Sequence, residues 1–161
     1  MIDALCDWLS KTPLSVAFQT AEWFVPLVQT IHILAIAIFL ISVYVISLRL
    51  LGVTHGARSI GSLMRGSAPW IWGALTVLLL TGMLLTITEP ARELLNWAFR
   101  TKMVLVLMLA ILLVVTQSAL RHDPDYWSAS PGRKLAGRSI GLLALIIGAG
   151  IVSAGRWIAY V

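Results

Sequence analysis

Four long apolar stretches, separated by short polar segments, dominate the pattern of hydrophobic and polar positions along the chain. They cover about residues 23–50, 69–88, 97–120 and 139–161. An α-helix needs about 20 predominantly apolar residues to cross a hydrocarbon layer of about 30 Å, and each stretch is near that length. The pattern therefore predicts an all-α, integral membrane four-helix bundle, forming a single transmembrane domain over residues 1–161.

A shorter amphipathic segment precedes the first apolar stretch. Residues 2–10 carry their apolar side chains mainly on one helical face, which is typical of a helix that lies in the membrane interface. Thr12 followed by Pro13 is an N-cap with a proline at the first helical position, and it predicts the start of another helix. That helix either continues into the first span with a bend at Pro26, or Pro26 marks the true start of the span.

Composition supports a membrane protein, since hydrophobic residues make up 59% of the 161 residues and charged residues only 12%. A chain of this size cannot hide so much apolar surface in its own core, so lipid must cover the rest. The net charge of +5 does not indicate nucleic-acid binding, because the basic residues flank the apolar stretches instead of forming one patch. The single cysteine, Cys6, excludes an internal disulfide and argues against a thiolate metal cluster.

The distribution of charge predicts the orientation, since cytoplasmic loops carry an excess of lysine and arginine. The side that holds the 53–68 and 121–138 loops has seven basic residues and two acidic ones, whereas the other side has five of each. We therefore expect a bacterial inner-membrane protein with both termini on the periplasmic side. Asp3 and Asp7 stand where a signal peptide would have basic residues, so we expect the first span to stay uncleaved.

His32 is the most informative residue, because an ionisable side chain inside a membrane span is costly and marks a functional site by default. It lies nine residues after Trp23, roughly 13–14 Å below the interface, and Met108 lies at a similar depth in the third span. This arrangement suits a haem b that has His32 as one axial ligand and Met108 as the other. The basic residues nearer the surface that would hold its propionates are Lys102, Arg100 and Arg156.

Three other roles for His32 stay open. Cu(I) prefers imidazole and soft sulfur ligands, and Met83 and Met103 lie at nearly matching depths, although methionine is also a common filler of apolar interiors. A lone intramembrane histidine also serves to hydrogen-bond a neighbour such as Gln29 and so to pack the bundle. The third role is proton transfer.

The fourth apolar stretch carries a stripe of small residues, in which Gly141, Gly148 and Gly155 recur every seven positions. Small residues let helix backbones approach closely, so the stripe predicts helix packing, either within the bundle or in a homodimer. A flat cofactor lying against the stripe is the alternative. If packing is its only role, the protein is a non-catalytic scaffold subunit of a membrane complex.

His55 and His122 are both expected at the cytoplasmic interface, where they would bind a second haem or a metal ion if the two helix ends adjoin. Turn-forming glycine, aspartate and proline residues surround them, which favours solvated loop residues instead. The sequence has no nucleotide-binding glycine loop, no zinc-ligand spacing and no nucleophile with an obvious base, so no catalytic residue is assigned.

The first span resembles the first helix of the membrane-type, oxygen-independent bacterial protoporphyrinogen oxidases. The resemblance rests on His32, followed by Tyr44, Leu48-Arg49-Leu50 and His55, and on a third span that reads Trp97-Ala-Phe-Arg-Thr-Lys102-Met103. The first helix is also similar to copper-resistance D-type membrane domains, and the layout is similar to a family of uncharacterised small four-span bacterial membrane proteins. The oxidases bind haem b on four spans, which implies roles for His32 and Lys102. The wider spacing between Tyr44 and Arg49 points to the shared haem bundle rather than to porphyrinogen oxidation.

The function that we expect is that of a haem b-binding membrane protein in electron transfer or redox chemistry, coupled to a partner protein or to the quinone pool. Copper handling or transport, with His32, Met83 and Met103 as ligands, is the first alternative. A membrane scaffold without a cofactor is the second.

Overall fold

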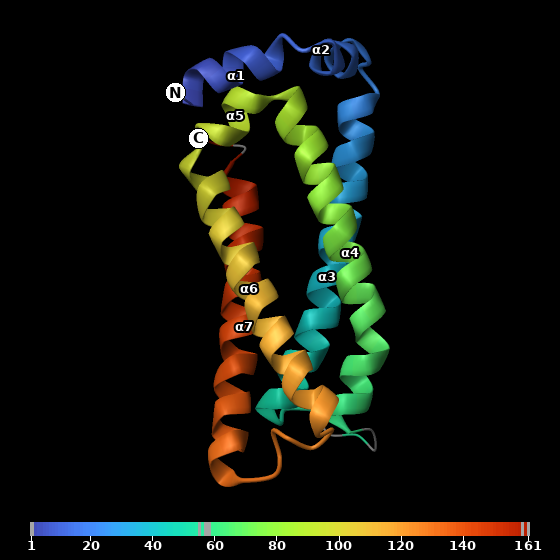
Figure 1. The fold of residues 1–161 in the computed structure, drawn as a ribbon, viewed down its shortest axis with the longest axis vertical. Coiled ribbons are helices and arrows are strands. Elements are labelled where there is room, and N and C mark those ends of the chain that lie inside the picture. Colours follow the sequence, from blue (N-terminus) through green and yellow to red (C-terminus); the bar gives the residue numbers. More distant parts are fainter. Residues whose placement is uncertain (1, 55, 57–58, 159, 161) are drawn as a thin grey trace.

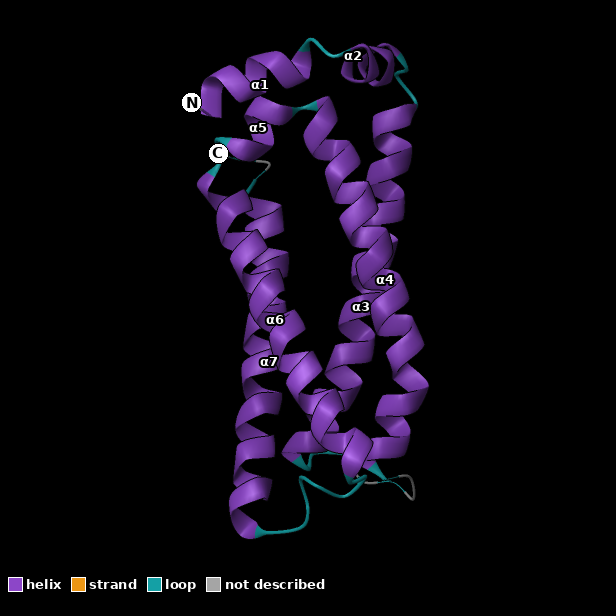
Figure 2. Ribbon diagram, in the orientation of Figure 1, coloured by secondary structure: helices purple, strands orange, loops and turns teal. Residues whose placement is uncertain are grey.

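The computed structural model describes residues 2–54, 56, 59–158 and 160, and this part of the chain is entirely helical outside its loops (Figure 2). Four long helices are α3 (Phe24–Leu51), α4 (Ile60–Thr88), α6 (Trp97–His122) and α7 (Pro131–Trp157). Three short helices are α1 (Ile2–Ser10), α2 (Pro13–Thr20) and α5 (Pro90–Leu94). The predicted fold class, an all-α bundle with a short N-terminal helix, is confirmed.

Lipid is the solvent for the four long helices. Each is long and apolar enough to cross a membrane, and each leaves large apolar side chains exposed on its outer surface. Exposed apolar surface of this extent is not tolerated by a water-soluble monomer. The protein is therefore an integral membrane protein with four spans.

Two spans begin earlier than the apolar pattern predicts, because polar N-caps set the helix ends. Helix α4 starts after Ser59, whose side chain accepts a hydrogen bond from the Ser62 backbone N–H, and Pro69 lies inside the helix instead of opening it. Helix α7 starts after Ser130, which caps the Arg133 N–H in the same way. Each cap adds about two polar turns to an apolar stretch, and the loop between α3 and α4 is correspondingly shorter than predicted.

The long helices form two pairs, α3 with α4 and α6 with α7, and the pairs are joined mainly where α3 packs against α7 (Figure 1). We call the end that carries α1, α2 and α5 the capped end, and the end with the 52–59 and 123–130 segments the loop end. The pairs lie close together toward the loop end and diverge toward the capped end (Figure 1). Helices α4 and α6 touch only sparsely, and a hydrogen bond of 2.9 Å from Trp72 Nε1 to Gln117 Oε1 joins them.

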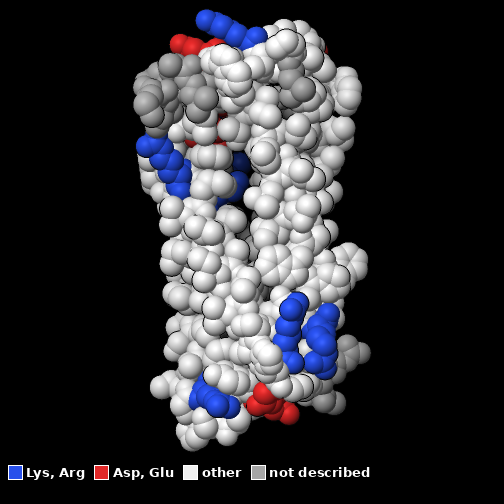
Figure 3. All heavy atoms as spheres, viewed as in Figure 1, with Lys and Arg blue, Asp and Glu red and all other residues white. Residues whose placement is uncertain are grey.

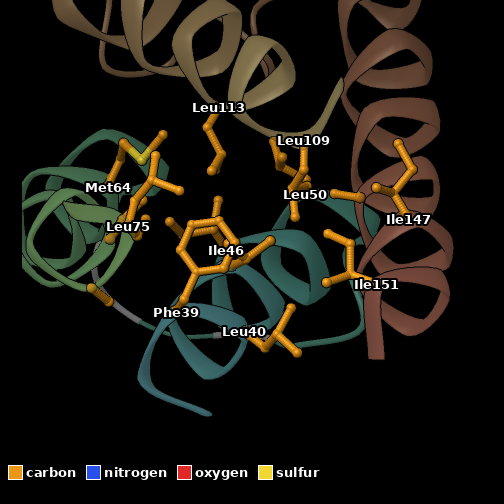
Figure 4. Close-up of a cluster of buried hydrophobic side chains, with 14 of the residues drawn as sticks. Phe39, Leu40, Ile46, Leu50, Met64, Leu75, Leu109, Leu113, Ile147 and Ile151 are labelled. Atoms are coloured by element: carbon orange, nitrogen blue, oxygen red, sulfur yellow. The ribbon is translucent and has the colours of Figure 1, made fainter. Parts of the chain in front are cut away.

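The hydrophobic core occupies the half of the bundle toward the loop end. Side chains from all four long helices converge there (Figure 4). Among the most deeply buried side chains are those of Val43, Ile46, Ile71 and Leu109, each of which is at most 2% exposed. The other half, toward the capped end, contributes few residues to this core.

The glycine stripe of α7 packs against other helices of the same chain. A Cβ at Gly141 would lie 2.8 Å from the Ser47 backbone oxygen, and one at Gly148 would lie 2.7 Å from the Tyr44 ring, so both glycines pack directly against α3. Gly155 instead faces Lys102 of α6. Gly141 and Gly148 are therefore buried within the bundle and Gly155 is half-buried, so the stripe packs inside the chain, and the homodimer stays a prediction.

The N-terminal helices lie across the capped end (Figure 1). Thr12 caps α2 as predicted, and α2 ends at Thr20, so it does not run on into α3. Two side chains fasten α2 to the end of α4: Ser15 Oγ donates to the Ile87 carbonyl at 2.8 Å, and Gln19 Nε2 donates to the Thr88 carbonyl at 2.7 Å. Because these carbonyls at the helix end lack intrahelical partners, the contact satisfies them and fixes α2 over the bundle.

Candidate functional site

A cavity of about 560 Å³ lies between the diverging helix pairs in the half toward the capped end. All four long helices and α5 line it, and most of the lining is apolar. Its size and apolar character are typical of a site for a small organic ligand or cofactor. The polar groups that face it are Gln29, His32 and Lys102 along its walls, with Glu89, Arg92 and Glu93 at the capped end.

His32 is hydrogen-bonded to Thr81 of α4. Thr81 Oγ1 lies 2.7 Å from His32 Nδ1, and the same hydroxyl donates to the Val77 carbonyl at 2.7 Å. This arrangement favours the tautomer that has its proton on Nδ1 and a lone pair on Nε2. An imidazole oriented in this way by a neighbour is the form that ligates metals.

Lys102 of α6 is the nearest polar neighbour of the free nitrogen. Its Nζ lies 3.5 Å from His32 Nε2, at the long limit of a hydrogen bond. Gly82 faces the His32 ring and Gly155 faces the Lys102 side chain, so the two glycines leave room around this pair. The structure thus brings together the two residues that the sequence resemblance singled out, although they are 70 positions apart.

Acidic residues balance the positive charge at the capped end of the cavity. Glu89 Oε2 and Arg92 Nη1 form a salt bridge of 2.7 Å. Glu93 is half-buried, and this burial raises the pKa of its carboxyl, while the positive charges of Lys102 and Arg92 oppose the rise. With two acidic and two basic residues, the cavity has no net formal charge when all four are ionised.

Three of the predicted site residues lie outside the cavity. Met108 is 43% exposed on α6 and does not line it, because its neighbour Leu109 takes the inward-facing position. Arg100 turns back to donate to the Leu94 carbonyl, and Arg156 donates to the Tyr160 hydroxyl. The structure therefore does not bring these three residues to His32, since helical phase and not depth alone decides which side chains meet.

Met83 and Met103, the predicted sulfur ligands for copper, do line the cavity together with His32. Both are also substantially exposed at its edge, by 64% and 41%. Of the predicted cytoplasmic histidines, His122 is exposed at the last residue of α6, and His55 lies outside the described residues. Within the described ranges, no group of three or more histidine, cysteine, aspartate or glutamate side chains is placed to hold a metal ion.

Two residues at the site were not assigned a role from the sequence. Thr81 is one of four threonines in the second apolar stretch, and nothing in the spacing separates it from those that bond only their own helix. Glu93 follows Glu89-Pro90 in a segment that the pattern marks only as a loop. The one available signal was the clustering of acidic residues at the same side as Lys102.

No protein-family model matches the chain, and neither a curated protein nor a solved structure is significantly similar to it. The family resemblance drawn from the first and third spans therefore stays a prediction. The cavity geometry is what carries the functional argument.

Proposed function

We propose that this protein is a haem b-binding membrane protein that transfers electrons in the bacterial inner membrane. The observation that supports it is the position of His32 in the lining of an apolar cavity of about 560 Å³, with its Nδ1 2.7 Å from Thr81 Oγ1. Apolar walls and one oriented imidazole suit a flat, largely apolar macrocycle. A bare metal ion would need converging ligands rather than a cavity of this size.

The residues present fit a haem with a changed ligand set. His32 would hold the iron, and Lys102 would hold the propionates together with Arg92, which lines the cavity in place of Arg100 and Arg156. Lys102 would have to leave Nε2, which its flexible side chain permits. Met103, which lines the cavity, replaces Met108 as the candidate for a second ligand.

A bound haem supplies reversible one-electron chemistry, and the chain supplies its surroundings. Thr81 orients the imidazole through the Nδ1 hydrogen bond. The apolar walls keep water away and lower the local dielectric, and both effects tune a reduction potential. Lys102 and Arg92 place positive charge where carboxylates would lie.

Absorbance spectra of the detergent-purified protein, oxidised and then reduced with dithionite, test the proposal. We expect a sharpened α-band on reduction that is lost in His32→Ala and kept in His122→Ala, the matched control at the exposed end of α6. A colourless protein from haem-replete cells would overturn the proposal. An unchanged spectrum in His32→Ala would overturn the ligand assignment.

Copper binding is the second candidate, because Met83 and Met103 line the cavity with His32. Thioether sulfur and imidazole nitrogen are ligands that suit Cu(I). Metal analysis of the purified protein distinguishes the two. Stoichiometric copper that is lost in Met83→Leu and Met103→Leu, and retained in Met108→Leu, would favour copper over haem.

A further inference from the structure

We infer that the cavity opens sideways to the bilayer between α4 and α6, and that a lipid-dissolved quinone docks at this opening, with its head group turned toward the haem proposed to lie inside. This inference names the partner of the proposed electron-transfer site and so rests on the proposed function. It stands on three features of the structure: the separation of α4 from α6, the apolar rim of the opening, and the neutral, donor-bearing interior.

The opening follows from the way the two helices are joined. Helices α4 and α6 touch sparsely, and the Trp72–Gln117 hydrogen bond lies on the loop-end side of the cavity-lining residues of both helices. Beyond it the helix pairs diverge, and the space-filling view shows this face hollowed between them, with basic side-chain atoms set back inside (Figure 3). The hollow lies along membrane-spanning helices, so its surroundings are hydrocarbon.

The rim of the opening is apolar. Leu79 and Met83 of α4 and Met103 of α6 line the cavity and are 55%, 64% and 41% exposed. The charged residues of the described lining lie deeper or at the capped end: Lys102 is partly buried beside His32, and Glu89, Arg92 and Glu93 belong to the α4–α5 corner. An apolar molecule could therefore pass the rim from the lipid without desolvating a charge.

Among molecules dissolved in the membrane, a quinone matches the hydrogen-bond donors and the balanced charge of the cavity lining. Lys102 Nζ and the Gln29 amide offer hydrogen-bond donors to carbonyl oxygens. The acidic and basic lining residues balance, so the cavity offers no net attraction to an anionic lipid head group. An uncharged flat ring with two carbonyl acceptors suits the donors that are reached from the opening, and its isoprenoid tail would stay between α4 and α6 in the hydrocarbon.

Photo-crosslinking tests the inference independently of haem content. The protein is reconstituted into phosphatidylethanolamine–phosphatidylglycerol vesicles and illuminated with an azido-ubiquinone that has a short isoprenoid tail. We expect label concentrated on residues 79–86 and 99–106, and abolished by excess unlabelled ubiquinone. Label spread over the lipid faces of all four spans, or displaced equally by added phospholipid, would overturn the inference.

Rim variants sharpen the test. Leu79→Trp and Met83→Trp add bulk to side chains of α4 that are already exposed, so the fold is kept while the opening narrows. Each should reduce labelling about tenfold, the effect of roughly 1.4 kcal/mol. Leu80→Trp on α4 and Leu107→Trp on α6, both exposed outside the cavity lining, are the controls and should label normally.

These experiments distinguish a failure of the haem proposal from a failure of the quinone inference. A haem spectrum without site-specific quinone labelling overturns the quinone inference and leaves the cytochrome proposal standing. Site-specific labelling of a colourless protein overturns the haem and leaves a quinone-binding membrane protein. Equal labelling of the rim variants and their controls rejects the α4–α6 route itself.

Discussion

His32 shows how a single residue obtains its chemistry from neighbours that are remote in the sequence. Its depth in the membrane follows from its position in α3, but its free nitrogen follows from the Val77 carbonyl, which takes the only proton of Thr81. A hydroxyl with a different acceptor would leave the imidazole free to carry its proton on Nε2. Helix α4 therefore favours the tautomer in which Nε2 keeps its lone pair.

Replacing Thr81 by valine removes this hydrogen bond at nearly constant volume. If His32 ligates a metal centre, we expect Thr81→Val to weaken binding of that centre by about 10–100-fold, the usual effect of losing an orienting partner. Titration of the haem-depleted protein with haem, followed by absorbance, measures the change. Thr76→Val is the control, because the exposed Thr76 hydroxyl bonds only the Trp72 carbonyl of its own helix. Equal affinities in both variants would contradict the role of Thr81.

Glu93 gives the stability of the protein a pH dependence. Burial raises the pKa of this carboxyl above its value of about 4.3 in an unfolded chain, so the folded protein binds a proton more tightly than the unfolded one. The contribution of Glu93 is therefore most favourable at low pH and is lost as the pH rises through the raised pKa.

Glu93→Gln should remove this dependence. We expect the variant to melt at a higher temperature than the wild type at pH 8 and at a similar temperature at pH 4, by thermal denaturation in detergent. Glu22→Gln, at an exposed position between α2 and α3, serves as the control and should follow the wild type at both pH values. A Glu93→Gln protein that melts below the wild type at pH 8 would show that its attraction to Lys102 outweighs burial.

At the scale of the elements, the contact of α3 with α7 is what holds the two helix pairs together. It depends on glycines that bring the backbones within van der Waals contact, as at Gly141 and the Ser47 carbonyl. In lipid, such close packing replaces the hydrophobic effect as the force between helices. The same closeness excludes any side chain at that position.

Gly141→Ala should therefore separate α3 from α7. Its Cβ would lie 2.8 Å from a backbone oxygen that cannot rotate away, so we expect a loss of about 1–3 kcal/mol, typical of an overpacked core. Gly73→Ala on α4 is the matched control, since a Cβ there meets no atom within 4 Å. Thermal unfolding of both variants in detergent compares them. A Gly141→Ala protein as stable as Gly73→Ala would contradict the packing role.

At the scale of the whole molecule, one half of the bundle supplies the packed core and the other half supplies the candidate binding cavity. Apolar side chains fill the half toward the loop end, whereas the half toward the capped end keeps a cavity among its few polar groups. Helices α1 and α2 lie over that second half, and Ser15 and Gln19 fasten α2 to the end of α4 (Figure 1). The packed core in one half thus positions the helices that line the cavity in the other half, and its own side chains do not fill that cavity.

The predicted orientation places the capped end in the periplasm, and cysteine labelling tests it. In a Cys6→Ser background, which removes the one native thiol, Lys11→Cys marks the capped end and Ser128→Cys marks the loop end. A membrane-impermeant maleimide should label Lys11→Cys in intact spheroplasts and Ser128→Cys only after lysis. The reverse pattern would place the loop end outside the cytoplasm.

The sequence by itself determined the membrane class and the existence of four spans, and it singled out His32 as the candidate site residue. These follow from local quantities, namely the length of apolar stretches and the cost of one ionisable group in hydrocarbon. The apolar pattern missed the polar first turns of α4 and α7, because the length of an apolar stretch does not record an N-cap that lies outside the hydrophobic layer.

Only the tertiary structure decided which residues share the site. Met108 and Arg156 match the expected depth and side, yet they face away, whereas Glu93 and Lys102 line one cavity with His32, which Thr81 contacts from α4. The depth of a side chain in the membrane depends on its position along its own helix, whereas the residues that it contacts depend on the rotation and crossing of several helices. Those are fixed by side-chain packing between segments far apart in the chain, which no local pattern records.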